Sequence, residues 1–178
     1  MKITAHPPPA IYRSRHKTPL GSMILAATTQ GLVGCWFEDD KHPPQWDAWP
    51  TPAQDSTGAA QRHMQAAAQH LDRYFKGENV DQWAKVLPVD WVHGTPFQQS
   101  VWKALLKIRH GHSLSYAEVA HQVGRPKAVR AVGSAIGRNP VSILVPCHRV
   151  LGSNGSLTGY AGGLHRKQAL LKLEGVLA

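Results

Sequence analysis

The sequence predicts an α+β protein of two domains, with a small β-sheet and one helix in residues 1–94 and a mostly helical domain in residues 95–178. Two observations predict this division. Short β-rich runs dominate the first part, whereas capping motifs that begin helices dominate the second. The charge is divided as well. Residues 1–94 hold nine Lys/Arg and nine Asp/Glu, whereas residues 95–178 hold eleven Lys/Arg and only two Asp/Glu.

The whole net charge of +9 therefore lies in the second half. A basic half beside a neutral half favours a domain that binds a polyanion such as nucleic acid over a basic face that is merely solvated. No apolar run approaches the ~20 residues of a membrane helix, and residues 1–17 lack the apolar core of a signal peptide. We therefore expect a cytoplasmic protein that has no membrane partner.

In the first half, residues 20–27 and 31–37 are β-rich runs on either side of a polar turn, which predicts a hairpin. A helix is predicted over residues 59–75, because apolar side chains share one helical face there. These side chains are Met64, Ala67, Ala68, Leu71, Tyr74 and Phe75. Three segments are expected to be irregular, namely a start containing His6-Pro7-Pro8-Pro9 (residues 1–17), a proline-rich surface loop (residues 38–55) and a linker (residues 77–94).

The second half carries clear signals for helix starts. Thr95 is followed by a proline and then by Gln98, the pattern of a capping box with proline at the first helical position. Ser115 and Glu118 form a second capping box, which opens a short helix. A third helix is predicted over residues 127–137 after a tight turn containing glycine. Two short helices joined by such a turn in a basic context predict a helix-turn-helix.

The third helix combines small residues with the large, cationic Arg130. Small residues let a helix approach a partner closely, and an arginine among them can reach into a groove or a base stack. The alternative is tight packing between helices, with Arg130 extending to solvent. The sequence leaves both interpretations open.

Cys147 is the candidate nucleophile. It follows Pro146 at the end of a short apolar run, residues 142–145, which predicts a buried strand. The neighbouring His148 and Arg149 are expected to favour a thiolate, although a free cysteine is more often an inert buried side chain. Cys35 lies in a β-rich run and is expected to be such a core residue. Two distant cysteines predict neither a disulfide scaffold nor a structural zinc site.

With these residues the second half resembles the O6-alkylguanine-DNA alkyltransferases, the methylated-DNA–protein-cysteine methyltransferases, in their free-standing bacterial form. The resemblance covers about residues 95–175, and a looser match surrounds Thr18-Pro19-Leu20-Gly21. The motifs that carry it are Asn139-Pro140, Pro146-Cys147-His148-Arg149-Val150, Phe97-Gln98, Val101-Trp102, Ser115-Tyr116, Ala131-Val132-Gly133, Gly159-Tyr160-Ala161-Gly162-Gly163, Leu170-Leu171 and Glu174-Gly175. It implies a ribonuclease H-like first domain and a winged helix-turn-helix second domain.

The resemblance also implies a mechanism of suicide repair. Cys147 would take the alkyl group from guanine O6, irreversibly and once per molecule. His148 would remove the thiol proton, through water, and Glu174 would orient the imidazole. Tyr116 would assist the leaving guanine, and Asn139 would hold the turn before Cys147. The residue types alone leave room for plainer roles, with Glu174 as a helix-end charge, Tyr116 as a core aromatic and Asn139 as a cap.

Substrate and DNA contacts follow from the same resemblance. Backbone groups of Cys147 and Val150 would accept from the exocyclic amine of guanine, the Ala161 amide would donate to O6, and Tyr160 would line the pocket. A stacked base cannot reach a buried sulfur, so the nucleotide must be flipped out of the duplex. Arg130 would fill the vacated space, and Arg125 and Ser153 would contact phosphates.

The resemblance implies double-stranded alkylated DNA as the partner, with O4-alkylthymine as a second substrate. It implies a monomer that needs no cofactor, metal or obligate protein partner. Two departures from the family pattern stand out. Ser142 occupies a place near the alkyl pocket where some relatives have proline, which puts tolerance of bulky adducts in doubt. Ala161 replaces a serine of some members, although the expected contact comes from its backbone.

Three other functions compete with this interpretation. A non-enzymatic module that flags alkylated bases would lack the cysteine, which is present here. A helix-turn-helix regulator would not need the Pro-Cys-His-Arg motif. A cysteine hydrolase would need an oxyanion-forming loop, and the sequence shows none.

Overall fold

The computed structural model describes residues 10–51, 54–55 and 57–178. Its first half contains an antiparallel sheet of three strands in the order β1-β2-β3. These are β1 (Tyr12–Thr18), β2 (Gly21–Ala27) and β3 (Leu32–Phe37), so the predicted hairpin of the second and third strands is confirmed. The pairing of Met23 with Phe37 and of Leu25 with Cys35 sets the register, and a bulge follows at Ala26/Ala27.

Strand β1 corrects one prediction, because residues 12–17 were expected to be irregular. The strand pairs with β2 along its full length, from Tyr12 opposite Ala27 to Thr18 opposite Gly21. Its sequence is mostly polar and basic, and no face of the strand is fully buried. An edge strand of this kind has no apolar alternation that would mark it in the sequence. The expected irregularity around His6-Pro7-Pro8-Pro9 lies outside the described residues.

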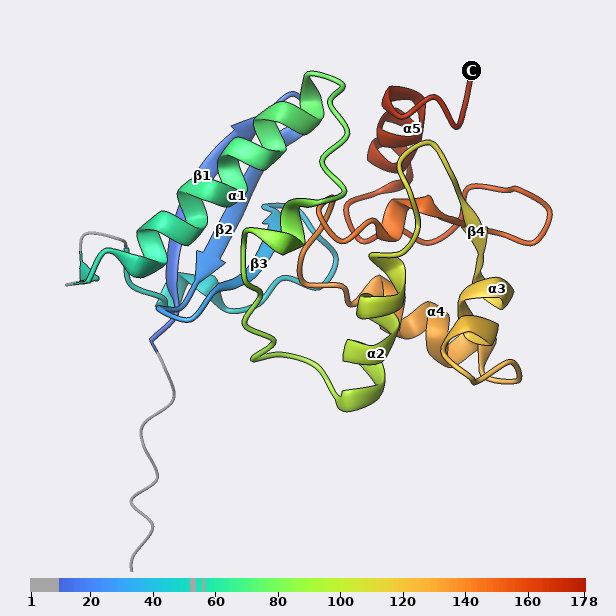
Figure 1. Ribbon diagram of the computed structural model, residues 1–178, viewed down its shortest axis with the longest axis horizontal. Coiled ribbons are helices and arrows are strands. Elements are labelled where there is room, and N and C mark those ends of the chain that lie inside the picture. Colours follow the sequence, from blue (N-terminus) through green and yellow to red (C-terminus); the bar gives the residue numbers. More distant parts are fainter. Residues whose placement is uncertain (1–9, 52–53, 56) are drawn as a thin grey trace, which may run out of the picture.

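Helix α1 (Ala59–Phe75) has the predicted bounds and lies along one face of the sheet, which Figure 1 shows. The buried side of the helix carries Ala60, Met64, Ala67, Leu71 and Tyr74. The other face of the sheet is covered by Trp46 and Trp49, whose rings lie 6.3 and 6.0 Å from that of Trp36. They belong to the proline-rich loop, in which Trp46 begins the short 3-10 helix η1 (Trp46–Ala48).

The linker is packed more closely than its glycine and proline content predicts. It contains the 3-10 helix η3 (Trp83–Lys85), and the indole of Trp83 is buried and donates to the carbonyl of Leu144 at 2.8 Å. Val89 forms a parallel bridge with Leu32 at the outer edge of β3. The linker therefore binds both halves together as it passes between them.

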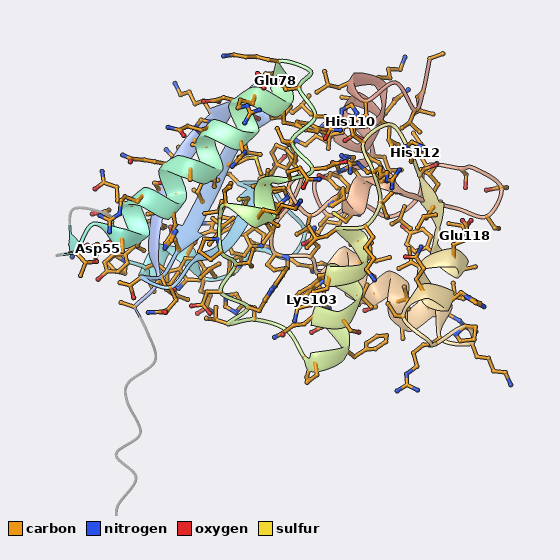
Figure 2. The ribbon with its side chains drawn as sticks, viewed as in Figure 1. Asp55, Glu78, Lys103, His110, His112 and Glu118 are labelled. Atoms are coloured by element: carbon orange, nitrogen blue, oxygen red, sulfur yellow. The ribbon has the colours of Figure 1, made fainter. Side chains whose placement is uncertain are left out.

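The second half begins with α2 (Pro96–Leu105), capped by Thr95 and Gln98 as predicted. Helix α3 (Tyr116–Gln122) starts at the second capping box, where Glu118, labelled in Figure 2, accepts from the Ser115 amide at 2.6 Å. Helix α4 (Val129–Gly137) begins two residues later than predicted, because Ala128 is still outside helical geometry. Helix α5 (Leu164–Leu173) closes the chain, and β4 (Leu114–Ser115) pairs in parallel with β5 (Val150–Leu151).

The strand predicted over residues 142–145 is wrong. The segment is buried but forms a turn, in which the Leu144 amide donates to Ser142 and the Val145 amide to Val141. Ile143 has a φ of +71°, a left-handed conformation that is unusual for a β-branched residue. Apolar composition predicted the burial of this segment correctly, but it carries no signal for the backbone reversal.

One apolar core runs through both halves, because residues of β2, β3, α1, α2, α4 and the 141–147 segment belong to the same cluster. Figure 1 shows the two halves side by side, with the 3-10 helix that follows the 142–145 turn at their junction. No helix among the described residues is long and apolar enough to cross a membrane.

Candidate active site

Cys147 opens the 3-10 helix η4 (Cys147–Arg149), which follows the turn directly. Asn139 shapes this turn, since its side-chain amide donates to the Val145 carbonyl at 2.9 Å and its oxygen accepts from the Val141 amide at 3.0 Å. Burial raises the pKa of the Cys147 thiol to about 11, against the opposing effects of a hydrogen bond from Asn139 and the charge of Lys167. The free site therefore holds a thiol at neutral pH.

This result corrects the expectation that neighbouring basic residues favour a thiolate. The guanidinium of Arg149 points away from the sulfur and is engaged elsewhere. It donates to Glu174 at 2.7 and 3.1 Å, to Asp81 at 3.0 Å and to the Ile108 carbonyl at 2.5 Å. Arg149 is close to Cys147 in the sequence, but its charge is not directed at the sulfur, because the 3-10 helix turns successive side chains in different directions.

His148 and Glu174 form the buried pair that the resemblance implied. The imidazole Nε2 lies 2.7 Å from Oε1 of Glu174, and both side chains are fully buried. A carboxylate only accepts, so Nε2 carries the hydrogen. The other nitrogen, Nδ1, is buried and has no hydrogen-bond partner among the described residues. Burial lowers the pKa of His148, although Glu174 opposes this, so the ring is neutral and Nδ1 can accept a proton.

Glu174 is held as an anion by the groups around it. Burial alone would raise its pKa, but hydrogen bonds and charge from His148 and Arg149 hold the pKa well below its usual range. A third donor comes from the first half, because the Tyr74 hydroxyl of α1 donates to Oε1 at 2.8 Å. Sequence reasoning assigned Tyr74 only to the buried face of a helix, and nothing in its spacing marked it as a partner of a residue 100 positions away.

Tyr116, the first residue of α3, donates to the carbonyls of Thr158 at 2.9 Å and Gly159 at 3.2 Å. Burial raises the pKa of its phenol, against a hydrogen bond with Thr158. The backbone of Gly159 approaches so closely that a Cβ there would lie 2.8 Å from the Tyr116 oxygen. Tyr116 therefore lies in direct contact with the backbone of the 158–161 loop, and the two together form one side of the site.

Lys167 was missed in the sequence. It is fully buried on α5, and its ammonium donates to the carbonyls of Val150 at 2.5 Å, Thr158 at 2.6 Å and Gly159 at 3.4 Å. Burial lowers its pKa to about 8. Leu164, Leu170 and Leu171 share its helix face and could have signalled a buried lysine, but its acceptors are backbone atoms, which leave no pattern in the sequence.

The expected substrate residues lie around this loop. Val150 follows Arg149 and is buried, and its carbonyl already accepts from Lys167. Tyr160 is 5% exposed, and its hydroxyl has no partner among the described residues. The Ala161 carbonyl accepts from the Lys41 amide at 3.3 Å. Ser142, in the turn, is buried and donates through its amide to the Cys35 carbonyl at 2.9 Å.

The expected DNA contacts lie on the surface. Helix α4 buries Val132, Ala135 and Ile136 against the protein. Arg130 and the small residues Ala131 and Ser134 are exposed. Part of the small-residue pattern thus serves packing between helices, as with Gly133 beside the Tyr116 ring, and part of it faces outward. Arg125 and Ser153 are also exposed, in the helix-turn-helix turn and in the loop after β5.

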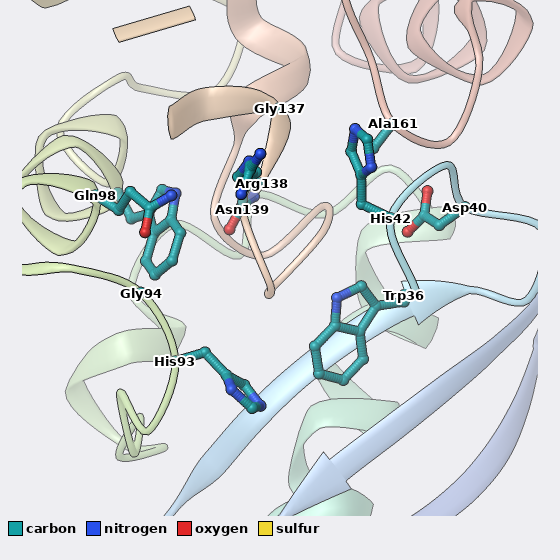
Figure 3. A pocket seen from close by; sticks show the side chains of 11 residues that line it. Trp36, Asp40, His42, His93, Gly94, Gln98, Gly137, Arg138, Asn139 and Ala161 are labelled. Carbon is teal, nitrogen blue, oxygen red and sulfur yellow. The ribbon is translucent and has the colours of Figure 1, made fainter. Parts of the chain in front are cut away.

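Residues of both halves, among them Asn139 and Ala161, line a cavity of about 320 Å³. Figure 3 shows the side chains around it. Trp36, His93 and Trp102 form apolar walls, and Arg138 and Asp40 lie at its edge. Burial raises the pKa of Asp40 to about 6. Among the residues that the structure describes, no group of three or more His, Cys, Asp or Glu side chains could hold a metal ion.

Two family models match the chain. Residues 96–176 match the DNA-binding domain of 6-O-methylguanine DNA methyltransferase, and residues 11–88 match the ribonuclease-like domain of the same family. A methylated-DNA–protein-cysteine methyltransferase of Methanosarcina acetivorans is 42% identical over 93% of this chain and 99% of its own length. The constitutive enzyme of that name from Bacillus subtilis is 41% identical over 90% of this chain and 92% of its own.

Solved structures agree with the family models. A crystal structure of Mycobacterium tuberculosis O6-methylguanine methyltransferase is 39% identical, covers 94% of both chains and superposes with a TM-score of 0.76. The M. tuberculosis OGT in complex with DNA is 40% identical, covers 93% of this chain and 92% of its own, and has a TM-score of 0.74.

Proposed function

Because this chain belongs to the 6-O-methylguanine DNA methyltransferase family, we propose that it repairs duplex DNA by transferring the alkyl group from guanine O6 to the sulfur of its own Cys147. It is a methylated-DNA–protein-cysteine methyltransferase. The observation that supports Cys147 as the acceptor is its position directly before a buried His148–Glu174 pair with a neutral imidazole.

The transfer is a direct displacement at the alkyl carbon. The thiol proton of Cys147 passes to Nδ1 of His148, through a water molecule, and Glu174 stabilises the imidazolium that forms. A bond from sulfur to the alkyl carbon forms as the bond from that carbon to O6 breaks, and the electron pair stays with guanine. Guanine gains one proton, so the sum of the reaction exchanges a thiol proton for an alkyl group. The raised pKa of Cys147 supports activation within the bound complex rather than a stored thiolate.

The loop around residues 158–161 supplies the base pocket. The carbonyls of Cys147 and Val150 accept from the exocyclic amine, the Ala161 amide donates to O6, and Tyr160 lines the pocket. Tyr116 turns its hydroxyl from the Thr158 carbonyl toward the guanine ring and donates to it as the base leaves. The hydrogen bonds of Tyr116 with this loop support that assignment, because a small rotation of the hydroxyl would move its hydrogen from the Thr158 carbonyl to a guanine bound beside the loop.

DNA binding belongs to the second half. Helix α4 enters the minor groove, Arg130 occupies the space that the flipped nucleotide leaves, and Arg125 and Ser153 contact phosphates. Their exposure on a half with eleven basic and two acidic residues supports this assignment. O4-alkylthymine presents a similar alkylated oxygen next to a ring nitrogen, and we propose it as a second substrate.

We further propose that residues 1–94 form a supporting domain and residues 95–178 the domain that binds DNA and accepts the alkyl group. One chain supplies every residue assigned to the site, which supports action as a monomer without an obligate protein partner. Cys35 and Cys147 are free thiols, and the need for a thiol acceptor supports a reducing compartment such as the cytoplasm. The product is a thioether, and no group of the site is suited to cleave it, so each molecule acts once.

The experiment that tests this function is stoichiometric. The protein is mixed with a duplex oligonucleotide that contains O6-methylguanine, and its intact and peptide masses are measured. We expect one added methyl group, located on the peptide with Cys147 and absent in Cys147→Ala. Repair of more than one methylated guanine per protein molecule would contradict the proposal that Cys147 is consumed in the reaction. DNA binding without a change in mass would indicate a non-enzymatic binder of damaged DNA.

A further inference from the structure

Tyr74 connects the supporting half to the proton-accepting pair. It lies near the end of α1, 1% exposed, and its hydroxyl donates to Oε1 of Glu174 at 2.8 Å. The same oxygen lies 2.7 Å from Nε2 of His148, and the Tyr74 oxygen is 3.4 Å from that nitrogen. The Tyr74 and His148 rings meet edge to face, with centroids 6.2 Å apart. The hydroxyl thus reaches the carboxylate at the point where His148 binds it.

We propose that Tyr74 is a positioning residue for alkyl transfer, whose hydroxyl shares the Glu174 oxygen that His148 binds, so that His148 stays neutral with its hydrogen on Nε2 and presents a bare Nδ1 toward the thiol proton. The proposal rests on the function proposed above and adds to it a contribution from the first half of the chain.

The arrangement around Glu174 explains why this donor matters. A buried carboxylate stays ionised only when its oxygens accept enough hydrogen bonds. Oε2 accepts from Nε of Arg149, whereas Oε1 accepts from His148, Tyr74 and Nη2 of Arg149, the last at a longer 3.1 Å. Without Tyr74, the imidazole becomes the main donor to Oε1. The carboxylate then becomes more basic toward the Nε2 proton, although Arg149 still binds both of its oxygens.

The charged groups around the pair set the direction of the pH effect. His148 and Arg149 face Glu174 from η4 and Tyr74 faces it from α1, while Asp81 acts through Arg149 and Lys167 of α5 acts on His148. Loss of the Tyr74 hydroxyl removes a donor to the anion and changes none of these charges. The pKa of Glu174 then rises, and the less solvated anion attracts a proton to His148 more strongly. The stronger attraction of a proton to His148 moves the acid limb of the transfer rate to higher pH, because His148 must be neutral to accept the thiol proton.

The test compares Tyr74→Phe with Tyr12→Phe. The second variant removes the same atom from β1 of the same half, where the Tyr12 hydroxyl forms no hydrogen bond with the described residues. Single-turnover transfer from a duplex with O6-methylguanine is measured from pH 5 to 9, together with the dissociation constant for DNA and thermal unfolding. Nitrogen-15 NMR of the histidine rings follows the protonation of His148 over the same pH range, and this readout requires no activity.

For Tyr74→Phe we expect transfer about tenfold slower at neutral pH, an acid limb at higher pH, unchanged DNA binding and protonation of His148 that begins at higher pH. Tyr12→Phe should match the unmodified protein in all four. A slower Tyr74→Phe with the same acid limb and the same protonation curve for His148 would show a purely structural role and overturn the proposal, as would an unchanged rate. Failure of the unmodified protein to accept a methyl group would instead refute the function itself, and the protonation curves would still decide whether Tyr74 keeps His148 neutral.

Discussion

Cys35 and Val141 form a parallel β-bridge that joins the sheet of the first half to the turn before Cys147. The Cys35 amide donates to the Pro140 carbonyl at 2.8 Å, and its carbonyl accepts from the Ser142 amide at 2.9 Å. The backbone of β3 therefore holds the chain on either side of Val141, at the start of the segment that leads to the acceptor cysteine. The sulfur of Cys35 takes no part in these bonds.

The first prediction follows from this bridge. Cys35→Ala should still accept one methyl group per molecule, because the bridge is made by backbone atoms. We expect a loss of about 1–2 kcal/mol in the free energy of unfolding, since the substitution leaves a small cavity in the core. Mass measurement after reaction with methylated DNA and denaturant unfolding check both parts. Failure of Cys35→Ala to accept a methyl group would show that this thiol, too, contributes to the chemistry.

The raised pKa of Cys147 predicts how the free protein reacts with iodoacetamide. Because the thiolate is the nucleophile, labelling should be slow at pH 7, rise about tenfold per pH unit, and level off near pH 11. Cys147→Ser measures the background from Cys35, whose pKa burial raises even further. A plateau reached below pH 8 would mean that the free site already stores a thiolate.

Glu174→Gln should damage both stability and transfer. The change leaves His148 and Arg149 without their anionic partner, which costs about 3–5 kcal/mol for a buried pair, and we expect transfer to slow about 100-fold. The pKa of Glu174 is lower in the folded protein than its ordinary 4.5, so its stabilisation is present above that pH and is lost as the pH falls below it. Unfolding curves should therefore show the difference between protein and variant constant from pH 6 to 8 and shrinking below pH 4.5.

Lys167→Met should loosen the loop that faces Tyr116. The variant keeps an unbranched side chain that ends one atom short of Nζ, but it leaves the carbonyls of Val150 and Thr158 without their charged donor, so we expect a loss of about 2–3 kcal/mol. Hydrogen exchange should increase across residues 158–161, and transfer should slow. Lys172→Met is the matched control, because Lys172 is exposed on the same helix. Equal effects of the two variants would show that the loss of stability comes from removing a positive charge from α5, and not from the hydrogen bonds of Lys167.

Arg130→Ala should separate base flipping from chemistry. We expect transfer from duplex DNA to fall about tenfold or more, because flipping a paired base costs a few kcal/mol that the arginine offsets. Reaction with free O6-methylguanine, which needs no flipping, should keep its rate. Arg130→Lys retains the charge but not the planar group, and its rate of transfer from duplex DNA should lie between the rates of Arg130→Ala and the unmodified protein. Equal losses with duplex and free base would exclude a role in flipping.

The sequence predicted those elements whose signals are local. The hairpin of β2 and β3, the bounds of α1 and the two capping boxes follow from spacing and capping residues within a few positions of each other. Strand β1 was missed because an edge strand with polar faces has no periodic signal. The 142–145 turn was missed because nothing about Ile143 favours its left-handed backbone.

The site shows the same limit. The resemblance to the family implied the pairing of His148 with Glu174, and the structure places Glu174 against His148. Tyr74 and Lys167 could not be found in this way, because their partners are a carboxylate 100 residues away and backbone carbonyls. The role of Arg149 was misjudged for a related reason, since proximity in the chain said nothing about where its guanidinium points.

The bridge between Cys35 and Val141 also protects the sheet from self-association. The outer edge of β3 is occupied at Leu32 by the linker and at Cys35 by the turn, while the opposite edge, β1, carries Arg13, Arg15 and Lys17. Neither edge offers an uncharged, open row of backbone groups to a strand of another molecule. Separation of the halves would uncover β3, a fully buried apolar strand, and turn it into a template for aggregation. The second half thus also covers an edge strand that could otherwise pair with a strand of another molecule.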